Sequence, residues 1–373
     1  MSNTSFRLSV LPLFWNHPKV ILCGGKSVGK SSLLRFLVNK CLYKWKQILV
    51  LDFDLGQCEF TLPGCISATV VEEPLLGPNF SHLKEPVRSV YLGEVDVTKC
   101  PEKYIEGCKS LIDFADENYS DIPWLVNTMG FTKGFGVSLA CGIITYTSPT
   151  HVVQIQSKDR KLNFPSLLEP QYVECLRHSA FDVALSRTDY QLYEIPSGSE
   201  QPGFVSKSRG MSPAESRNLV ILSYMSRMLN SNTSSLSQVT PYMINMDKLK
   251  LLTINEYNLT KSQVAATMNG NMVALCLETP SNKFLDCRGF GIVRAVDWQN
   301  NTLFLITPLP PSELSGVNCL VKGNIGLPDS LYYNQGELVT GHVPYLAHTS
   351  AGSTARFAKR DFRSLPVTQR SYR

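Results

Sequence analysis

The sequence predicts an α/β protein whose mostly parallel sheet carries helices on both faces and is followed by a smaller β-rich domain. Up to about residue 230, short apolar runs of strand length alternate with patterns of helical period. Such alternation is typical of a parallel sheet with helices packed on it. Beyond residue 239, strand-like runs follow one another, which indicates a second domain built mainly of strands.

The first part should contain strands at 20–23, 48–53, 87–97, 124–127, 152–156 and 191–195. Helices are expected from Ser32 and at 101–119, 136–146 and 165–178. Residues 60–86 are rich in proline and glycine and show no clear helix, so we expect them to cross the mouth of a site.

A later helix is expected from Ser212, because Ser212 and Glu215 form a capping-box pattern and Pro213 occupies the first helical position. Its expected apolar face consists of Leu219, Leu222, Met225, Met228 and Leu229. Residues 230–238 are a serine- and asparagine-rich linker, where we place the domain boundary. The strands beyond it are expected at 251–254, 272–277, 291–296, 302–307 and 317–321, with a hairpin turn at 297–301.

Residues 24–31, GGKSVGKS, match the phosphate-binding pattern G-x-x-x-x-G-K-[ST] between a strand and a helix. Glycines let backbone N–H groups turn inward around phosphates, and the helix N-terminus adds its own donors. Lys30 can reach the β- and γ-phosphates, and the Ser31 hydroxyl can bind Mg²⁺. A glycine-rich turn before an ordinary helix is the alternative, which the two flanks disfavour. The expected nucleotide contacts come from Gly24, Gly25, Lys26, Ser27, Val28, Gly29, Lys30, Ser31 and Ser32.

Asp52 and Asp54 end the next strand, in the stretch DFDLGQ at 52–57. Because strand side chains alternate, both carboxylates should lie on the same side, beside the phosphate loop. One carboxylate can hold Mg²⁺, directly or through water, while the other takes a proton from an attacking hydroxyl. The alternative is a pair of solvated carboxylates at a strand end.

Together with NTMGFTKGFG at 127–136, these motifs resemble the eukaryotic polynucleotide 5'-hydroxyl kinases, and most closely their nucleolar branch, which acts in pre-ribosomal RNA processing. The resemblance implies transfer of the γ-phosphoryl group of ATP, with Mg²⁺, to the 5'-hydroxyl of RNA. Asp54 would deprotonate that hydroxyl, Asp52 would support the metal, and Gln57 would position substrate or a metal-bound water. It also implies an endonuclease partner that leaves 5'-hydroxyl ends, and a nucleolar location.

Residues 128–134 resemble the clasp that lies over the substrate end in this family. Thr128, Gly130, Phe131 and Lys133 are its expected substrate contacts. The family commonly has tryptophan at the position of Phe131, and phenylalanine can still stack on a base. Packing of Phe131 in the core is an equal alternative.

Residues 197–217 resemble the kinase lid, whose basic residues close over ATP. Arg209 aligns with a lid arginine, which makes it a catalytic candidate, and Lys207 is a possible second cation. A solvated basic loop is the alternative.

The expected organisation is a lead-in at 1–18, a kinase domain at 19–232, a β-rich domain at 239–345 and a basic tail at 346–373. Longer family members carry an N-terminal β-rich domain before the phosphate loop, so we expect this chain to be a fragment or a short isoform. The tail could track RNA phosphates or dock on a partner, and the sequence favours neither.

Composition sets outer bounds on function. Of 373 residues, 43% are apolar and 18% charged, and the net charge of +5 permits a polyanionic partner without requiring one. No apolar run reaches the ~18 residues that span a membrane. The 11 cysteines show no C-x-x-C pair, so we expect reduced thiols and no structural zinc site.

Two other functions stay open. A P-loop NTPase switch or metallochaperone would hydrolyse nucleotide to change partner, although no N-K-x-D guanine-reading motif is present. A non-catalytic RNA-processing scaffold could keep a nucleotide site for stability, but the presence of Lys30, Ser31, Asp52 and Asp54 disfavours it.

Overall fold

The computed structural model describes residues 17–176, 189–198, 211–254, 259–279 and 284–333. Contacts within the chain define two compact units. The first comprises residues 1–61, 65–89 and 97–209, and the second comprises 62–64, 90–96 and 210–373. The second unit therefore starts before the linker at 230–238, where we expected the boundary.

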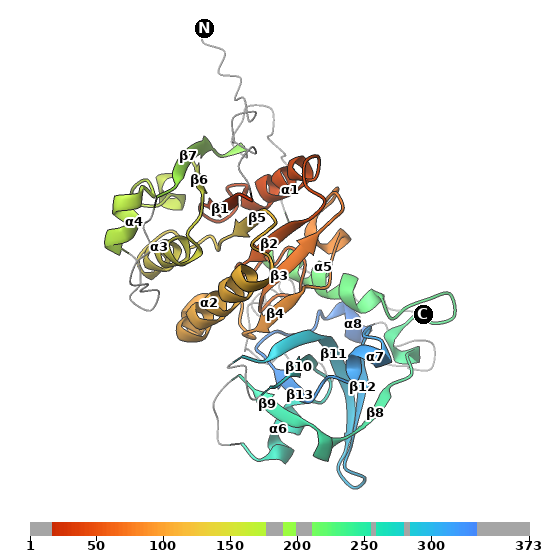
Figure 1. Cartoon of the computed structure of the whole chain (residues 1–373). Helices are drawn as coiled ribbons and strands as arrows, with labels where there is room; N and C mark the ends of the chain where they lie inside the picture. The colour runs from red at the N-terminus through yellow and green to blue at the C-terminus, as the bar shows by residue number, and fades with distance from the viewer. Residues whose placement is uncertain (1–16, 177–188, 199–210, 255–258, 280–283, 334–373) are drawn as a thin grey trace, which may run out of the picture. The chain divides into compact units, whose positions relative to one another are not determined.

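The first unit is built on a mostly parallel sheet, as predicted (Figure 1). Its strands are β1 (Lys19–Cys23), β2 (Ile48–Asp52), β3 (Cys65–Val71), β5 (Trp124–Asn127), β6 (His151–Gln156) and β7 (Gln191–Pro196). They lie in the order β7-β6-β1-β5-β2-β3, and each adjacent pair is parallel except β2 and β3. Strand β4 (Arg88–Tyr91) begins in the first unit and ends in the second.

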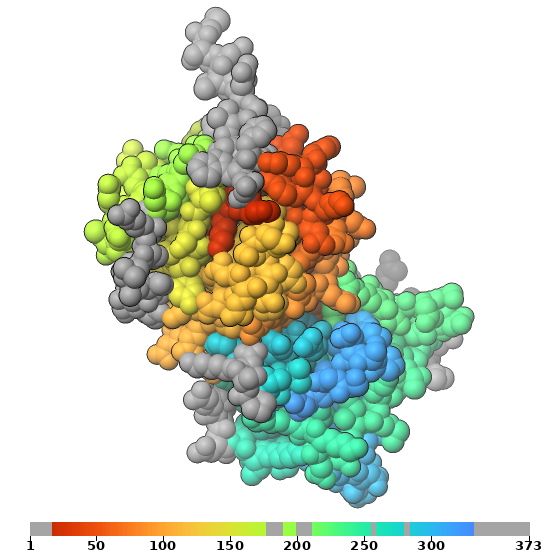
Figure 2. Space-filling view, viewed as in Figure 1, coloured from red at the N-terminus to blue at the C-terminus, as the bar shows by residue number. Residues whose placement is uncertain are grey.

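Among the described residues of the first unit, four α-helices accompany these strands: α1 (Lys30–Cys41), α2 (Pro101–Asn118), α3 (Phe135–Thr147) and α4 (Pro170–Leu176). Leu34, Leu37 and Val38 of α1 pack on Val20 and Leu22 of β1. The alternate strand residues point away from α1, and α2 and α3 contact β3 and β1 there. Figure 1 shows α1 on one side of the strands and α2 and α3 on the other, and the space-filling view shows the outer faces of α1 and α2 at the surface (Figure 2).

The second unit is rich in strands. It contains β8 (Tyr242–Asn245), β9 (Lys250–Thr253), β10 (Met272–Leu277), β11 (Asp286–Asp297), β12 (Thr302–Ile306) and β13 (Cys319–Lys322). Its helices are α5 (Pro213–Ser226), α6 (Lys261–Met268), α7 (Pro311–Leu314) and α8 (Ser330–Tyr333). The order is β11-β10-β13-β9, and β12 joins β11 to β8. The predicted hairpin between β11 and β12 is confirmed, with Asp297 paired to Thr302.

Residues from distant parts of the sequence complete the second unit. Leu92 N donates to Gly64 O at 2.8 Å, and Asn324 N donates to Gly93 O at 2.8 Å. The Asn324 side chain also donates to the Glu94 carboxylate, 230 residues away in sequence. The second unit thus includes short segments that precede most of the first unit in the chain.

Several expected elements differ from the structure. Residues 60–86 were expected to cross the mouth of a site, but 65–71 form β3, which extends the sheet antiparallel to β2. The expected strand at 87–97 shortens to β4, and the expected helix at 165–178 begins only at Pro170. Helix α6 and strand β8 were not expected. Met246, just after β8, and Val264 in α6 are both buried in the core of the second unit. This core joins residues that are far apart in the sequence, so local patterns do not reveal it.

Helix α5 has the predicted capping box, with Ser212 and Glu215 bonded to each other's backbone N–H. Its predicted apolar face is wrong, because its buried residues are Val220, Ile221, Tyr224 and Met225. Of the five expected residues only Met225 is buried, and Leu229 is exposed. The buried face centres on Tyr224, whose hydroxyl accepts a hydrogen bond from Phe290 N at 3.0 Å.

Two further observations concern membrane-spanning helices and disulfides. Among the described residues, no helix combines the length and the apolar character needed to cross a membrane. All 11 cysteines lie in the described part, and none forms a disulfide.

Trp124→Ala should lower the free energy of unfolding by about 3–5 kcal/mol, because this fully buried side chain leaves a cavity in the sheet. Urea unfolding of the native chain and the variant measures the difference. Tyr43→Ala is the matched control, since Tyr43 is 87% exposed and its loss should cost less than about 0.5 kcal/mol. Equal losses in the two variants would contradict the described packing.

Candidate active site

The phosphate loop follows β1 and ends in the first turn of α1. Gly29 precedes α1 with φ 108°, a left-handed conformation that favours glycine. Ser27 also has a positive φ, 60°. These turns direct the chain into a helix N-terminus whose N–H groups have no side-chain cap. The loop therefore has the geometry of an anion site, as the motif predicts.

The Lys30 ammonium lies inside the loop. Its Nζ donates to Gly24 O at 3.0 Å and to Gly25 O at 2.8 Å, and the residue is buried. Burial lowers the pKa of Lys30, while the nearby negative charge of Asp54 acts in the opposite direction. A desolvated cation held by two carbonyl groups is well placed to interact with phosphate oxygens.

Three other segments of the first unit contact the loop. A Cβ atom at Gly25 would lie 2.2 Å from the Leu162 carbonyl oxygen, and one at Gly130 would lie 2.7 Å from Lys26 N. Ser197 Oγ donates to Val28 O at 2.8 Å. The loop is thus supported from the chain that follows β5, the chain that follows β6 and the chain that follows β7.

Asp52 is buried at the end of β2, and its carboxylate accepts three hydrogen bonds. Oδ1 accepts from Asp54 N at 3.2 Å and from Asn127 Nδ2 at 2.9 Å, and Oδ2 accepts from Glu59 N at 2.6 Å. Burial raises the pKa of Asp52 to about 7, although these hydrogen bonds oppose the rise. These three bonds fix the carboxylate and leave one acceptor position on Oδ2.

Asp54 is half-buried, closer to the surface than Asp52. Its Oδ1 accepts from Gly56 N and Gln57 N, both at 3.0 Å, which fixes the carboxylate at the start of a turn. Among the described residues, no hydrogen bond to its Oδ2 is found. Gln57 Nε2 donates to Gly56 O at 2.9 Å, so this side chain lies along the same turn.

The three motifs of the site start from one row of the sheet. Leu22 in β1 and Asp52 in β2 are both in register with Asn127 in β5. Thr128 follows Asn127, is buried, and donates from Oγ1 to Leu22 O at 2.7 Å. The structure therefore brings together the phosphate loop, the two aspartates and the start of the 128–134 segment.

The remaining clasp residues separate into packed and exposed groups. A Cβ atom at Gly136 would lie 2.4 Å from Phe131 Cγ, so the Phe131 ring lies against the start of α3 and is half-buried. Lys133 is exposed and forms part of the wall of a cavity. Phe131 therefore packs on its own segment, while Lys133 remains accessible to a ligand.

Glu59 also belongs to the site, although no sequence motif predicts it. It is buried, and its carboxylate accepts from Arg35 Nε at 2.5 Å and from Arg35 Nη2 at 3.0 Å. His82 Nε2 lies 2.8 Å from its Oε1. Since Glu59 N also binds Asp52, this residue joins the aspartate strand end to α1. No local signal in the sequence links Arg35 to Glu59.

Other predictions cannot be placed. Arg209, Lys207 and residues 199–210 of the expected lid lie outside the described residues, as do residues 1–16 of the lead-in and the basic tail at 346–373. The tasks predicted for Arg209 and the tail therefore stay predictions.

Two family models match the chain. The model for the mRNA cleavage and polyadenylation factor CLP1 P-loop matches residues 24–196, and the model for the NOL9-like C-terminal domain matches residues 237–328. Two solved structures of Clp1p with Pcf11p have TM-scores of 0.56 and 0.54 at 16% and 17% identity. Each covers 84% of this chain and 75% of the solved chain, and the likeness establishes the fold alone.

Curated relatives named polynucleotide 5'-hydroxyl-kinase NOL9 occur in several eukaryotes. The Drosophila melanogaster protein is 32% identical over 92% of this chain and 36% of its own length. The Homo sapiens protein is 32% identical over 88% of this chain and 52% of its own length. The Arabidopsis thaliana protein is 28% identical over 95% of this chain and 100% of its own length. The chain thus spans about a third of the fly relative and about half of the human one.

Gly25→Ala should weaken nucleotide binding by about tenfold or more, because the new methyl group collides with the Leu162 backbone and displaces the loop. Titration with a fluorescent ATP analogue measures the change. Gly316→Ala in the second unit is the matched control, since its methyl group would make only an ordinary contact, 3.7 Å from Glu313 O. Unchanged affinity in Gly25→Ala would show that the loop does not rest on Leu162.

The unfolding free energy should depend on pH through Asp52. Its folded pKa of about 7 lies above the ordinary 3.8, so the folded chain retains a proton that the unfolded chain releases. This contribution to stability is complete below about pH 4 and is lost as the pH rises to about 7. Relative to Asp52→Asn, the native chain should lose up to about 1.4 kcal/mol per pH unit in that interval.

Urea unfolding at pH 4.5 to 7.5 tests this slope. Asp121→Asn, an exposed carboxylate, is the control and should follow the native curve. Parallel curves for the native chain and Asp52→Asn would contradict the raised pKa of Asp52.

Proposed function

We propose that this chain, as a member of the family of eukaryotic polynucleotide 5'-hydroxyl kinases, transfers the γ-phosphoryl group of ATP to the 5'-hydroxyl of RNA. One observation carries the proposal more than any other. A phosphate loop, a carboxylate with an available oxygen and the 128–134 segment arise from one row of the sheet. A phosphoryl donor and an acceptor hydroxyl can meet there.

The donor end of the site would bind ATP. The N–H groups of residues 24–31 would surround its phosphates, and Lys30 would move from the carbonyl groups of Gly24 and Gly25 toward the β- and γ-phosphates. The Ser31 hydroxyl, and the Asp52 carboxylate through water, are oxygen donors of the kind that Mg²⁺ prefers. A bound Mg²⁺ would neutralise phosphate charge.

The acceptor end would use Asp54. Its Oδ1 is fixed by two backbone N–H groups, so Oδ2 can face a substrate hydroxyl and accept its proton. Asp52 positions Asp54 by accepting from its N–H, while Gln57, next along the turn, can orient the substrate. We thus keep Asp54, the base predicted from the sequence, as the proposed base, and we add a positioning task for Asp52 to its proposed support of the metal.

We further propose that the substrate is pre-ribosomal RNA, in the nucleolus. The support is the wording of the NTMGFTKGFG segment, which resembles the nucleolar branch of the family. A kinase of this kind requires ends that carry a 5'-hydroxyl, so an endonuclease that leaves such ends is the proposed partner. Arg209 remains the proposed lid arginine.

Lys30→Ala should reduce phosphoryl transfer by about 10²–10³ through loss of a charge that binds the transferring group. Asp54→Asn should reduce it by about 10²–10⁴ through loss of the base. The measurement is transfer of label from γ-labelled ATP to a 5'-hydroxyl oligoribonucleotide. Lys40→Ala, on the exposed side of α1, is the control and should keep native activity.

The products separate the alternatives. Labelled phosphate in water with none on RNA would favour an NTPase switch over a kinase. ATP binding without either product would favour a scaffold. An active Lys30→Ala variant would contradict the assigned site.

A further inference from the structure

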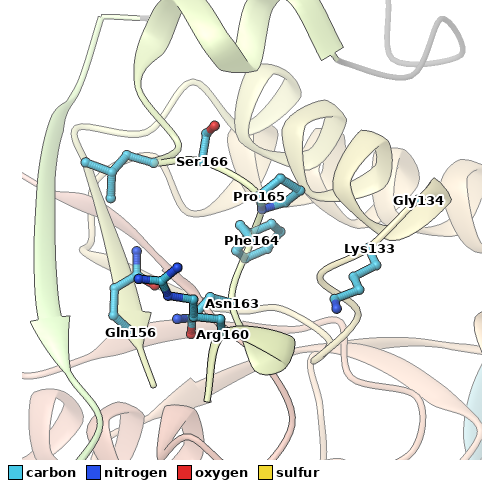
Figure 3. A pocket seen from close by; sticks show the side chains of 9 residues that line it. Lys133, Gly134, Gln156, Arg160, Asn163, Phe164, Pro165 and Ser166 are labelled. Carbon is cyan, nitrogen blue, oxygen red and sulfur yellow. The ribbon is translucent and has the colours of Figure 1, made fainter. Parts of the chain in front are cut away.

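A cavity of about 650 Å³ lies in the first unit beside the phosphate loop. Lys133 and Gly134 form one wall, Gln156 and Arg160 form another, and residues 163–167 complete it. Figure 3 shows Lys133 on one side, Gln156 and Arg160 on the other, and Phe164 between them. None of the proposed ATP contacts lines this cavity, whereas Lys133 is one of the expected substrate contacts and Arg160 has no predicted task.

Both walls continue segments that touch the phosphate loop. The Lys133 wall follows Gly130, which lies directly against Lys26. The Arg160 wall leads to Leu162, whose carbonyl oxygen contacts Gly25. Both walls of the cavity are therefore continuous with segments that contact the phosphate loop.

The charges of the lining favour an anion. Among the described residues of the lining, Lys133 and Arg160 are the charged ones, both are exposed, and none is a carboxylate. Within the described part of the chain, neither cation forms an ion pair. Two cations that face a cavity without a counter-charge repel each other, and an anionic ligand between them removes that repulsion.

The lining also contains an aromatic ring that suits a nucleotide, and hydrogen bonds hold the lining segment in place. Phe164 is buried with its ring at the cavity. Asn163 clamps its loop by donating to Ser157 O at 2.7 Å and accepting from Ser157 N at 2.8 Å. Gln154, fully buried, accepts from Leu168 N at 2.7 Å. Such a wall needs little rearrangement when it binds a ligand.

We propose that this cavity binds the RNA strand at its reacting end, with Lys133 and Arg160 on the phosphodiester group that follows the first nucleotide. The proposal rests on the proposed kinase function. The nucleoside of ATP is neutral and would have no use for two cations, whereas the RNA backbone carries a charge at each linkage.

The test compares Arg160→Gln and Lys133→Gln with Lys161→Gln, an exposed lysine beside Arg160 that does not line the cavity. Two 3'-labelled RNAs with a 5'-hydroxyl are used, one native and one with a neutral methylphosphonate at the first linkage. Fluorescence anisotropy gives RNA affinity, and a fluorescent ATP analogue gives nucleotide affinity. Thermal melting confirms that each variant is folded.

Each cavity variant should weaken binding of the native RNA by about tenfold and lower the salt dependence of log Kd by about 0.7 per cation lost. ATP affinity should not change. The effect of Arg160→Gln should disappear on the RNA with the neutral linkage, and Lys161→Gln should behave as the native chain.

Weaker ATP binding with unchanged RNA binding would overturn the proposal and assign the cavity to the nucleoside. Unchanged affinities for both would also overturn it. Because these are binding measurements, cavity-dependent RNA binding without phosphoryl transfer would support the cavity and contradict the kinase function. If phosphoryl transfer proceeds equally well in the native chain and in both cavity variants, the cavity proposal is contradicted and the kinase proposal is not.

Discussion

The buried carboxylate of Asp52 accepts three hydrogen bonds, and each fixes a different part of the site. The bond from Asn127 joins two neighbouring strands at the row where the motifs begin. The bond from Asp54 N sets the turn that carries the candidate base, and the bond from Glu59 N leads to the pair with Arg35 on α1. Burial raises the pKa of Asp52, because removing its carboxylate from water disfavours the charged form. The hydrogen bonds that order the site therefore form at a cost in desolvation of this carboxylate.

The phosphate loop shows the same use of distant parts of the sequence. Its own residues supply the turns and the lysine, but its shape is enforced by Gly130, Leu162 and Ser197, which come from three other strand ends. Close backbone approach at Gly25 and Gly130 leaves no room for a side chain. The loop can therefore respond to a ligand only together with the segments that line the neighbouring cavity.

The fold class and the site motifs could be predicted because each depends on local spacing. The loop pattern, the alternation that places Asp52 and Asp54, and the capping box before α5 are all contained in a few consecutive residues. The support of Asp52 by Asn127 and Glu59, and the position of Leu162 over Gly25, depend on packing between distant segments. Strand β3 was missed because proline and glycine around it obscured the β-branched run, and the apolar face of α5 was misplaced because Tyr224 is buried through its partner Phe290.

The second unit contains residues 62–64 and 90–96, which are bonded to each other and to residue 324. During synthesis these segments leave the ribosome long before their C-terminal partner exists, while most of the strands of the first unit can already pair. The second unit can therefore close only after its C-terminal residues have been synthesised. For the same reason, a cut of the chain near residue 230 would separate these segments from residue 324 and would not yield the two units intact.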